Sequence, residues 1–375
     1  MGTSKQDQAK YNRLLSRLDA ARGDAMSTRV HQEEETTPCG DPSRKCRWTI
    51  LTANRNDAPS LTAFLEELST VLRQAGRDDA CRLFVVDDQS FDDSIQILES
   101  WKVHSASLTL HILPLATNLG NQGALAFGLQ SLDASQSDYV MTLDCDGEDD
   151  LSRIPALMEL AENNSDHIVF TERGQRFDPL IIRFFYHAYR VFFMLTTGLS
   201  ITPSNFMILP SAFVPAVQKS PFLPAFFAMS ALRLGFPYRR IKVDRRPRYS
   251  GQSSQNIYTL MSHGLVAIAT FYERTIPRSI LTILGSTLVS LSCFVAAFFL
   301  IKLPPLLPFY LSLTSALSLA IISIAYSIVI PFSFLILLMK VFHFAHASKK
   351  HTGTKGGDTT LSTQHAPRRL PQNNS

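Results

Sequence analysis

Between residues 47 and 147 the sequence repeats one unit, in which a short apolar run ends in acidic or amide side chains and an amphipathic stretch follows. The apolar runs are RWTILTAN, CRLFVVDDQS, LTLHILPL and DYVMTLDCDG. The stretches between them, SLTAFLEELSTVLRQAG, DDSIQILESW and GNQGALAFGLQSL, have the pattern of helices. This alternation favours an α/β fold with a parallel, Rossmann-like sheet and crossover helices. We expect one such domain over residues 46–250.

Polar side chains gather where the expected strands end. They are Asn54 and Asp57 after the first strand, Asp87 and Asp88 after the second, Asn118 after the third, and Asp144 and Asp146 after the fourth. Ligands bind at the carboxyl ends of strands in open parallel sheets. Alternate residues leaving a strand point the same way, so Asp144 and Asp146 can share one divalent cation, Mg²⁺ or Mn²⁺. The sequence therefore predicts a metal site at the end of the fourth strand.

Two long uncharged runs near the end of the chain predict transmembrane helices at residues 280–303 and 311–339. Arg274 and Arg278 precede the first run and Lys340 follows the second, which predicts that both ends face the cytoplasm. Residues 1–45 and 340–375 are polar, and we expect a disordered extension and a cytoplasmic tail. Residues 251–279 are expected to form a basic segment at the membrane interface. The chain is thus expected to be an integral membrane protein that contacts lipid.

The net charge and the distribution of basic residues indicate which kinds of partner the chain binds. The net charge of +4 argues against a dedicated nucleic-acid-binding protein, which usually has a clustered basic excess. Arginines and lysines between residues 239 and 278 instead suggest anionic lipid or phosphate nearby. The sequence leaves a homo-oligomer open.

Four motifs resemble those of family 2 glycosyltransferases with the GT-A fold, in the polyprenyl-phosphate branch. They are TANRND, VVDDQSFDDS, NLGNQGALAFGL and TLDCDGEDDLSRIPAL, and RPRYSGQSS resembles the element that precedes the membrane segments of that branch. The resemblance covers residues 47 to 345. It implies transfer of one sugar from a nucleotide sugar to a polyprenyl phosphate, with inversion at the anomeric carbon. The branch is similar to dolichol-phosphate mannose synthases and bactoprenol glucosyltransferases.

The resemblance also implies roles for the residues at the strand ends. Asp87 and Asp88 would contact the nucleoside, and Asn54 and Asp57 would line the base and ribose site. Asp144 would contact the ribose or the metal, and Asp146 the metal on the diphosphate. Asn118 and Gly120 belong to the predicted nucleotide-sugar site, where Gly120 either allows close approach of the donor or is an ordinary turn glycine.

The acceptor side is expected to need cations more than a base, because a lipid phosphate is already ionised near neutral pH. Arg173, Arg176, Arg248 and Ser253 are the candidates for binding that phosphate, and Arg248 is also placed among the catalytic residues. Arg183 and Arg190 belong to an amphipathic, aromatic-rich stretch, and snorkelling to a membrane interface explains them equally well.

Several departures from the family pattern leave alternatives open. Asp57 stands where the family has Glu, Asn205 replaces an acid, and Met207 and Ser254 replace basic residues. These changes point either to a different substrate or to reduced activity. One alternative is a family 2 transferase acting on a glycan or lipid hydroxyl, with Glu148, Asp149 or Asp150 as base. The other is a degenerate GT-A scaffold that binds nucleotide sugar without turnover. Asp149 or Asp150 is also interpreted as the cap of the following helix.

Overall fold

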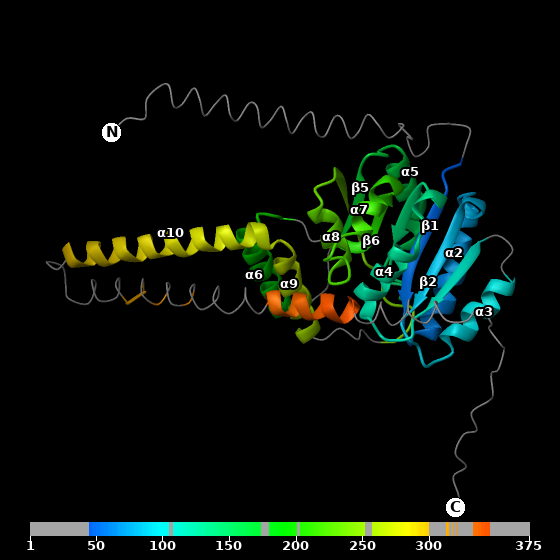
Figure 1. Cartoon of the computed structure of the whole chain (residues 1–375), viewed down its shortest axis with the longest axis horizontal. Helices are drawn as coiled ribbons and strands as arrows, with labels where there is room; N and C mark the ends of the chain where they lie inside the picture. Colours follow the sequence, from blue (N-terminus) through cyan, green and yellow to red (C-terminus); the bar gives the residue numbers. More distant parts are fainter. Residues whose placement is uncertain are drawn as a thin grey trace, which may run out of the picture.

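Seven strands form one sheet, which lies at the centre of the α/β domain (Figure 1). The computed structural model describes residues 45–104, 108–173, 180–200, 203–251, 257–299, 313–314, 317, 321 and 333–345. The strands are β1 (Trp48–Asn54), β2 (Cys81–Asp87), β3 (Thr109–Pro114), β4 (Tyr139–Thr142), β5 (Ile168–Arg173), β6 (Pro203–Pro210) and β7 (Tyr238–Val243). Their order across the sheet is β3-β2-β1-β4-β6-β5-β7. The α/β class expected from the sequence is confirmed.

The sheet as a whole is mixed, because its second half lies beyond the four strands that the sequence predicts to be parallel. Strands β3, β2, β1 and β4 are parallel, as the alternation with helices predicts. Strand β6 runs antiparallel to both β4 and β5, and β7 is parallel to β5. The reason for the difference is that a buried apolar run such as that of β6 has the same pattern in either direction. The parallel half brings the ends of β1, β2, β3 and β4 to one edge.

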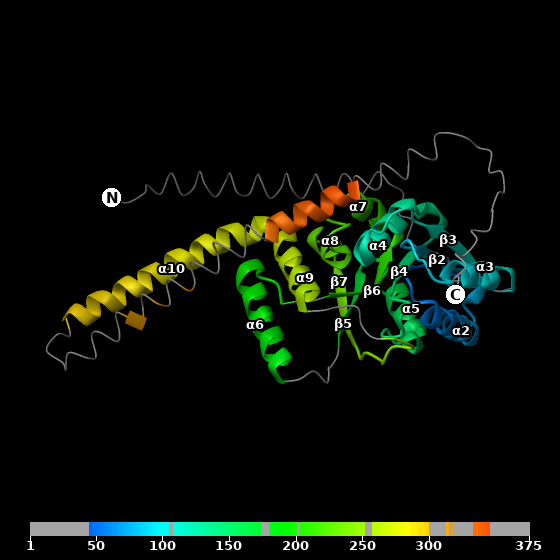
Figure 2. The same cartoon turned by 90° about the horizontal axis from the view of Figure 1, so that it is seen from below.

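Helices cover both faces of the sheet (Figures 1 and 2). Side chains of α2 (Ala58–Gln74), α3 (Ser94–His104) and α5 (Ile154–Glu162) pack in one core, and those of α4 (Gly120–Ser131), α7 (Val214–Gln218) and α8 (Phe227–Arg233) pack in the other. Strand β1 serves both cores because its side chains alternate. Trp48 and Ile50 belong to the core under α2, and Leu51 to the core under α4.

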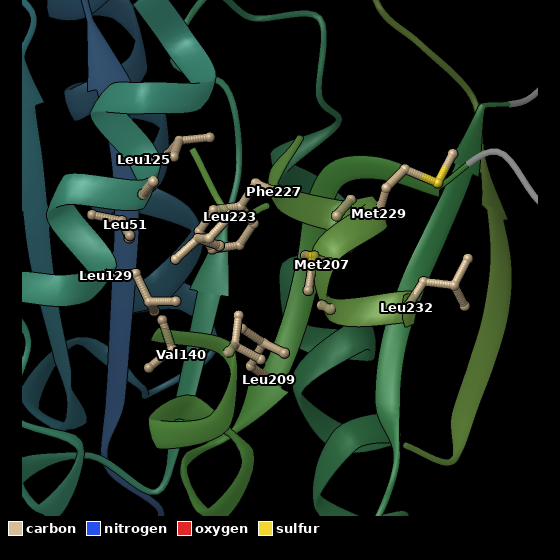
Figure 3. Packing of buried hydrophobic residues seen from close by; sticks show 14 of the residues in the cluster. Leu51, Leu125, Leu129, Val140, Met207, Leu209, Leu223, Phe227, Met229 and Leu232 are labelled. Carbon is tan, nitrogen blue, oxygen red and sulfur yellow. The ribbon is translucent and has the colours of Figure 1, made fainter. Parts of the chain in front are cut away.

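The core beneath α4 and α8 joins the parallel half of the sheet to the antiparallel strand β6 (Figure 3). Leu125 and Leu129 of α4 lie over Leu51, while Leu209 of β6 lies beside Val140 of β4 (Figure 3). All five of these side chains are buried. The start of α4 is therefore held firmly over the ends of β1 and β2.

Three helices lie beyond the sheet, namely α6 (Leu180–Thr197), α9 (Ile257–Thr270) and α10 (Tyr272–Phe299), which extends away from the α/β domain (Figures 1 and 2). A further helix over residues 333–345, here called the C-terminal helix, returns toward the domain. Within the described residues, no helix combines the length and apolarity needed to cross a membrane. The extension 1–44 and most of the predicted span 311–339 lie outside the described residues.

Candidate active site

The ends of β1 and β2 bring a buried amide and a buried carboxylate together. Asn54 and Asp87 are register partners at the last positions of these strands, and each is 2% exposed. The Asn54 amide donates to Asp87 Oδ1 at 3.4 Å, and Asp87 Oδ2 accepts from the Ser90 backbone N–H at 3.0 Å. The two predicted nucleotide-site residues thus form one hydrogen-bonded floor at the edge of the sheet.

Asp88 and Asn118 fix the start of α4. Asp88 Oδ1 accepts from the Leu119 N–H at 2.6 Å, and Asn118 Oδ1 accepts from the Gly120 N–H at 2.9 Å. Gly120 has φ +70°, a left-handed conformation that favours glycine. Burial raises the pKa of Asp88, although hydrogen bonds from the backbone N–H groups of Leu119 and Gly120 lower it. The first turn of α4, with amide groups that suit an anion, is therefore held beside the ends of the strands.

The acidic loop, residues 144–150, follows β4. Strand β4 ends at Thr142, two residues before the first acid. Cys145 is 5% exposed and its Sγ donates to the Ala53 carbonyl oxygen at 3.2 Å, so this side chain points into the core. Asp144 and Asp146 on either side of it are half-buried. The predicted alternation holds in the loop, and the two carboxylates lie close enough to influence each other.

Asp146 carries the charge that is hardest to accommodate. Burial first, and then the charge of Asp144, raise its pKa to about 6, with a smaller contribution from Asp57. Arg248 and Arg245 act in the opposite direction. An ionised carboxylate that is disfavoured by burial and by a second carboxylate is stabilised by a bound cation. Asp57 and Asp144 therefore both contribute negative charge to the surroundings of Asp146.

Asp144 and Asp146 are the residues that could hold a divalent cation. Asp144 Oδ1 accepts from the Asn121 amide at 3.1 Å, while Asp146 Oδ1 and Oδ2 accept from the Glu148 N–H and from Arg248. The described residues contain no group of three or more His, Cys, Asp or Glu side chains arranged to hold a metal. Two carboxylates with hard oxygen donors suit Mg²⁺ or Mn²⁺ when a diphosphate completes the ligand set.

The remaining acids of the loop have structural partners. Asp150 Oδ1 accepts from the Ser152 N–H at 3.2 Å and caps the helical turn Leu151–Arg153, which confirms the predicted cap. Asp149 Oδ2 accepts from the Asp144 N–H at 2.9 Å. Glu148 forms ion pairs with Arg245 and, at 3.2 Å, with Arg248. These contacts assign Glu148, Asp149 and Asp150 to holding the loop in shape.

An arginine segment, residues 245–249, lies along the acidic loop. The Arg246 N–H donates to the Glu148 carbonyl oxygen at 3.0 Å, and the Tyr249 N–H donates to that of Asp146 at 3.1 Å. Arg248 forms an ion pair with Asp146 at 2.6 Å. The segment thus binds the loop through its backbone as well as its side chains. In this structure Asp146 and Glu148 are the partners of Arg248, so a phosphate that binds Arg248 would compete with these carboxylates for its N–H groups.

Helix α2 anchors the other end of the arginine segment. Glu67 of α2 accepts from the Tyr249 hydroxyl at 2.6 Å and forms an ion pair with Arg246. The ring of Tyr249 packs on Gly147, where an added Cβ would lie 2.5 Å from Cδ2. Sequence reasoning missed Glu67, Arg246 and Tyr249. The sequence feature that could have predicted this contact is the presence of an acidic cluster and an arginine cluster, whose opposite charges favour pairing with each other.

Other predicted acceptor residues are placed less fully. Arg176 and Ser253 lie outside the described residues, as does Ser254. The backbone of Arg173 ends β5 and is paired with Val243 of β7. Arg190 is exposed on α6. Arg248 is the predicted acceptor-phosphate residue whose side chain the structure describes, and it contacts the acids of the loop.

The departures on β6 are accommodated by local packing. The Asn205 side chain accepts from the Gln122 amide at 3.1 Å, and Gln122 in turn accepts from the Phe227 N–H at 2.7 Å. Met207 is completely buried and packs in the core beneath α4 and α8. Asn205 thus connects β6 to the first turn of α4. Met207 packs in the core at a position where the family pattern has a basic residue.

Part of the chain matches a known protein family. Residues 49–213 match the family described as glycosyl transferase family 2. An undecaprenyl-phosphate 4-deoxy-4-formamido-L-arabinose transferase of Pectobacterium carotovorum is 28% identical over 258 residues, which cover 66% of this chain and 73% of that protein. The uncharacterised glycosyltransferase sll0501 of Synechocystis is 26% identical over 227 residues, covering 59% of this chain and 68% of that protein.

Two solved structures match the chain at low identity. One is the mannosyltransferase PcManGT from Pyrobaculum calidifontis in complex with GDP-Man and Mn²⁺, with a TM-score of 0.44, 14% identity and coverage of 84% of this chain and 81% of that one. The other is glucosyl-3-phosphoglycerate synthase from Mycobacterium tuberculosis with Mn²⁺, UDP and glucosyl-3-phosphoglycerate. Its TM-score is 0.43 at 14% identity, with coverage of 64% of this chain and 82% of that one.

Proposed function

Because residues 49–213 match glycosyl transferase family 2, we propose that the chain is a transferase of this family and propose the reaction that it catalyses. One sugar passes from a nucleotide sugar to a polyprenyl phosphate, with inversion at the anomeric carbon. The observation that carries this proposal is the direct contact between the acidic loop and the arginine segment, in which Arg248 lies 2.6 Å from Asp146. Groups that suit a metal diphosphate and a group that suits a phosphate acceptor are thus side by side.

On the donor side, the floor formed by Asn54 and Asp87 would receive the nucleoside, and the first turn of α4 would lie near the diphosphate. Asp144 and Asp146 would hold Mg²⁺ or Mn²⁺. When bound, the cation neutralises the charge that develops on the nucleoside diphosphate as it leaves. The carboxylates hold their positions through Asn121 and through the Glu148 backbone.

On the acceptor side, the contacts favour a phosphate over a hydroxyl. A hydroxyl nucleophile needs a general base, and the candidates are Glu148, Asp149 and Asp150. Each of these carboxylates is engaged by an arginine or by a backbone N–H. An ionised phosphate needs only cations that position it, and Arg248 supplies a planar guanidinium group beside Asp146.

The proposal places the reaction at the cytoplasmic face of a membrane. Its support is an apolar face on α10, where Leu281, Leu284 and Leu288 are 67%, 56% and 64% exposed. Residues spaced by three or four lie on one side of a helix. An exposed leucine stripe of this kind suits a lipid environment better than water. Two relatives carry the name undecaprenyl-phosphate 4-deoxy-4-formamido-L-arabinose transferase, which fits an acceptor of this kind.

The test is transfer in membranes that contain the full-length protein. Labelled nucleotide sugars are incubated with undecaprenyl or dolichyl phosphate and with Mg²⁺, Mn²⁺ or EDTA. A mild-acid-labile sugar phospholipid, lost with EDTA, is the expected product. Label that appears only in a polymer or on a lipid hydroxyl would refute the phosphate acceptor. Donor binding without any turnover would instead identify a non-catalytic scaffold.

A further inference from the structure

The C-terminal helix ends beside the loop that opens the candidate donor site (Figure 2). Leu337 is 1% exposed in a small core with Ala225 and Val266. Phe344 is 8% exposed in the core beneath α4, and His343 Nε2 donates to the Asn118 carbonyl oxygen at 3.2 Å. The helix is therefore docked at both ends, and its last turn touches the residues that lead into α4.

Lys340 lies on the docked face of this helix. It is three residues after Leu337 and four before Phe344, and residues with this spacing share one side of a helix. It is half-buried, between two side chains that are almost completely buried. It is also one turn before His343, about 4.5 Å along the helix axis. Lys340 therefore lies one helical turn from the residue that contacts the loop leading into α4.

No group among the described residues compensates the charge of Lys340. Its ammonium forms neither an ion pair nor a hydrogen bond within the part of the chain that the structure describes. Burial alone lowers its pKa, with no contribution from a carboxylate. The acidic loop, for its part, is paired with the arginine segment. A half-buried cation without a counter-charge is unfavourable, and an anionic ligand relieves that cost.

We propose that Lys340 binds a substrate phosphate at the junction of the C-terminal helix and α4. The inference rests on the proposed function, which supplies two phosphate-bearing ligands. Lys340 directly follows the predicted span 311–339, so the phosphate of a lipid beside that span would lie near this residue. The donor diphosphate would reach it from the first turn of α4, which follows directly from the Asn118 carbonyl that His343 contacts. The shared chemistry is a phosphate oxyanion facing an ammonium group.

The experiment measures binding by full-length protein in nanodiscs, without requiring turnover. The variants are Lys340→Gln, which removes the charge, and Lys340→Arg, which keeps it. Lys102→Gln is the matched control, because Lys102 is an exposed lysine of α3 on the opposite side of the sheet. Kd is measured for undecaprenyl phosphate incorporated in the nanodiscs and for inorganic pyrophosphate added in solution. Circular dichroism and Tm verify that each variant is folded.

Lys340→Gln is expected to weaken one of the two ligands by about ten- to a hundredfold, the loss expected for one charge-assisted contact. Lys340→Arg should keep most of the affinity, and Lys102→Gln should match the wild type. If only the affinity for undecaprenyl phosphate falls, Lys340 binds the acceptor phosphate. If only the affinity for pyrophosphate falls, Lys340 binds the donor diphosphate. If both affinities stay within about twofold of the Lys102→Gln control, the proposal is overturned.

The binding assay separates this inference from the proposed function. A wild-type protein that binds phosphate through Lys340 but transfers no sugar to any lipid would refute the function and leave the site standing. A protein that transfers sugar with unchanged KM for both substrates in Lys340→Gln would refute the site and leave the function standing.

Discussion

Replacing Asp146 by Asn should stabilise the protein in the absence of divalent cations and destroy its response to them. The folded pKa of Asp146 is about 6, against an ordinary value of 3.8. At about 1.4 kcal/mol per pKa unit, ionising this buried carboxyl at pH 8 lowers the free energy of unfolding by at most ~3 kcal/mol. Asn carries no charge, so the variant should recover up to this amount.

The dependence on pH gives the sign of the effect. Because the folded pKa lies above the unfolded value, the metal-free wild type should lose stability as the pH rises from about 4 to about 6. Asp146→Asn should lose less over the same range. The comparison uses Tm and urea midpoints of both proteins, measured under identical conditions with EDTA.

Adding Mn²⁺ should reverse the order of the two proteins. A ligand present at a hundred times its Kd stabilises the folded state by about 2.7 kcal/mol, and the variant has lost one of the two carboxylates proposed to hold the metal. Transfer activity should disappear in Asp146→Asn. A variant that is less stable than the wild type in EDTA at pH 8, or that gains as much from Mn²⁺, would refute the reasoning.

Three further substitutions examine the loop and its partner segment. Gly147→Ala should lower stability by about 1–3 kcal/mol and reduce transfer, since φ is +91° and the new Cβ would meet Tyr249; thermal unfolding and initial rates measure both. Tyr249→Phe should cost about 1 kcal/mol through the lost hydrogen bond to Glu67, measured by urea unfolding, and an unchanged midpoint would contradict that bond's contribution. Asp150→Ala should cost about 1 kcal/mol through the lost cap while keeping transfer in membranes; complete loss of transfer in a folded variant would favour Asp150 as a base.

The first half of the fold could be predicted from the sequence, because its patterns are local. The expected strands match β1, β2 and β3 to within a few residues, and GNQGALAFGLQSL is α4. Strand β4 is shorter than expected, since the chain leaves the sheet before Asp144. The direction of β6 and the existence of β7 could not be predicted. Strand β7, YRRIKV, is a mostly exposed edge strand, and its basic residues give it the composition of an interface segment.

The candidate site was predictable as a list of acids but not as a network. Asp144 and Asp146 follow from their spacing, and burial of Cys145 between them confirms the alternation. The partners of Glu148 lie about 100 residues away, and no local pattern pairs them. Likewise, the contact between His343 and Asn118 depends on how the chain returns after α10, which local periodicity does not encode.

The ion pair between Arg248 and Asp146 makes the two sides of the site thermodynamically linked. A guanidinium group that bonds to a carboxylate has fewer N–H donors left for a phosphate. Whatever neutralises Asp146, whether a proton or a cation, therefore raises the affinity of Arg248 for phosphate. By reciprocity, a phosphate that draws Arg248 away raises the affinity of Asp146 for a cation by the same factor. Positive cooperativity between cation and phosphate acceptor would thus arise from one shared side chain, with no movement of the sheet.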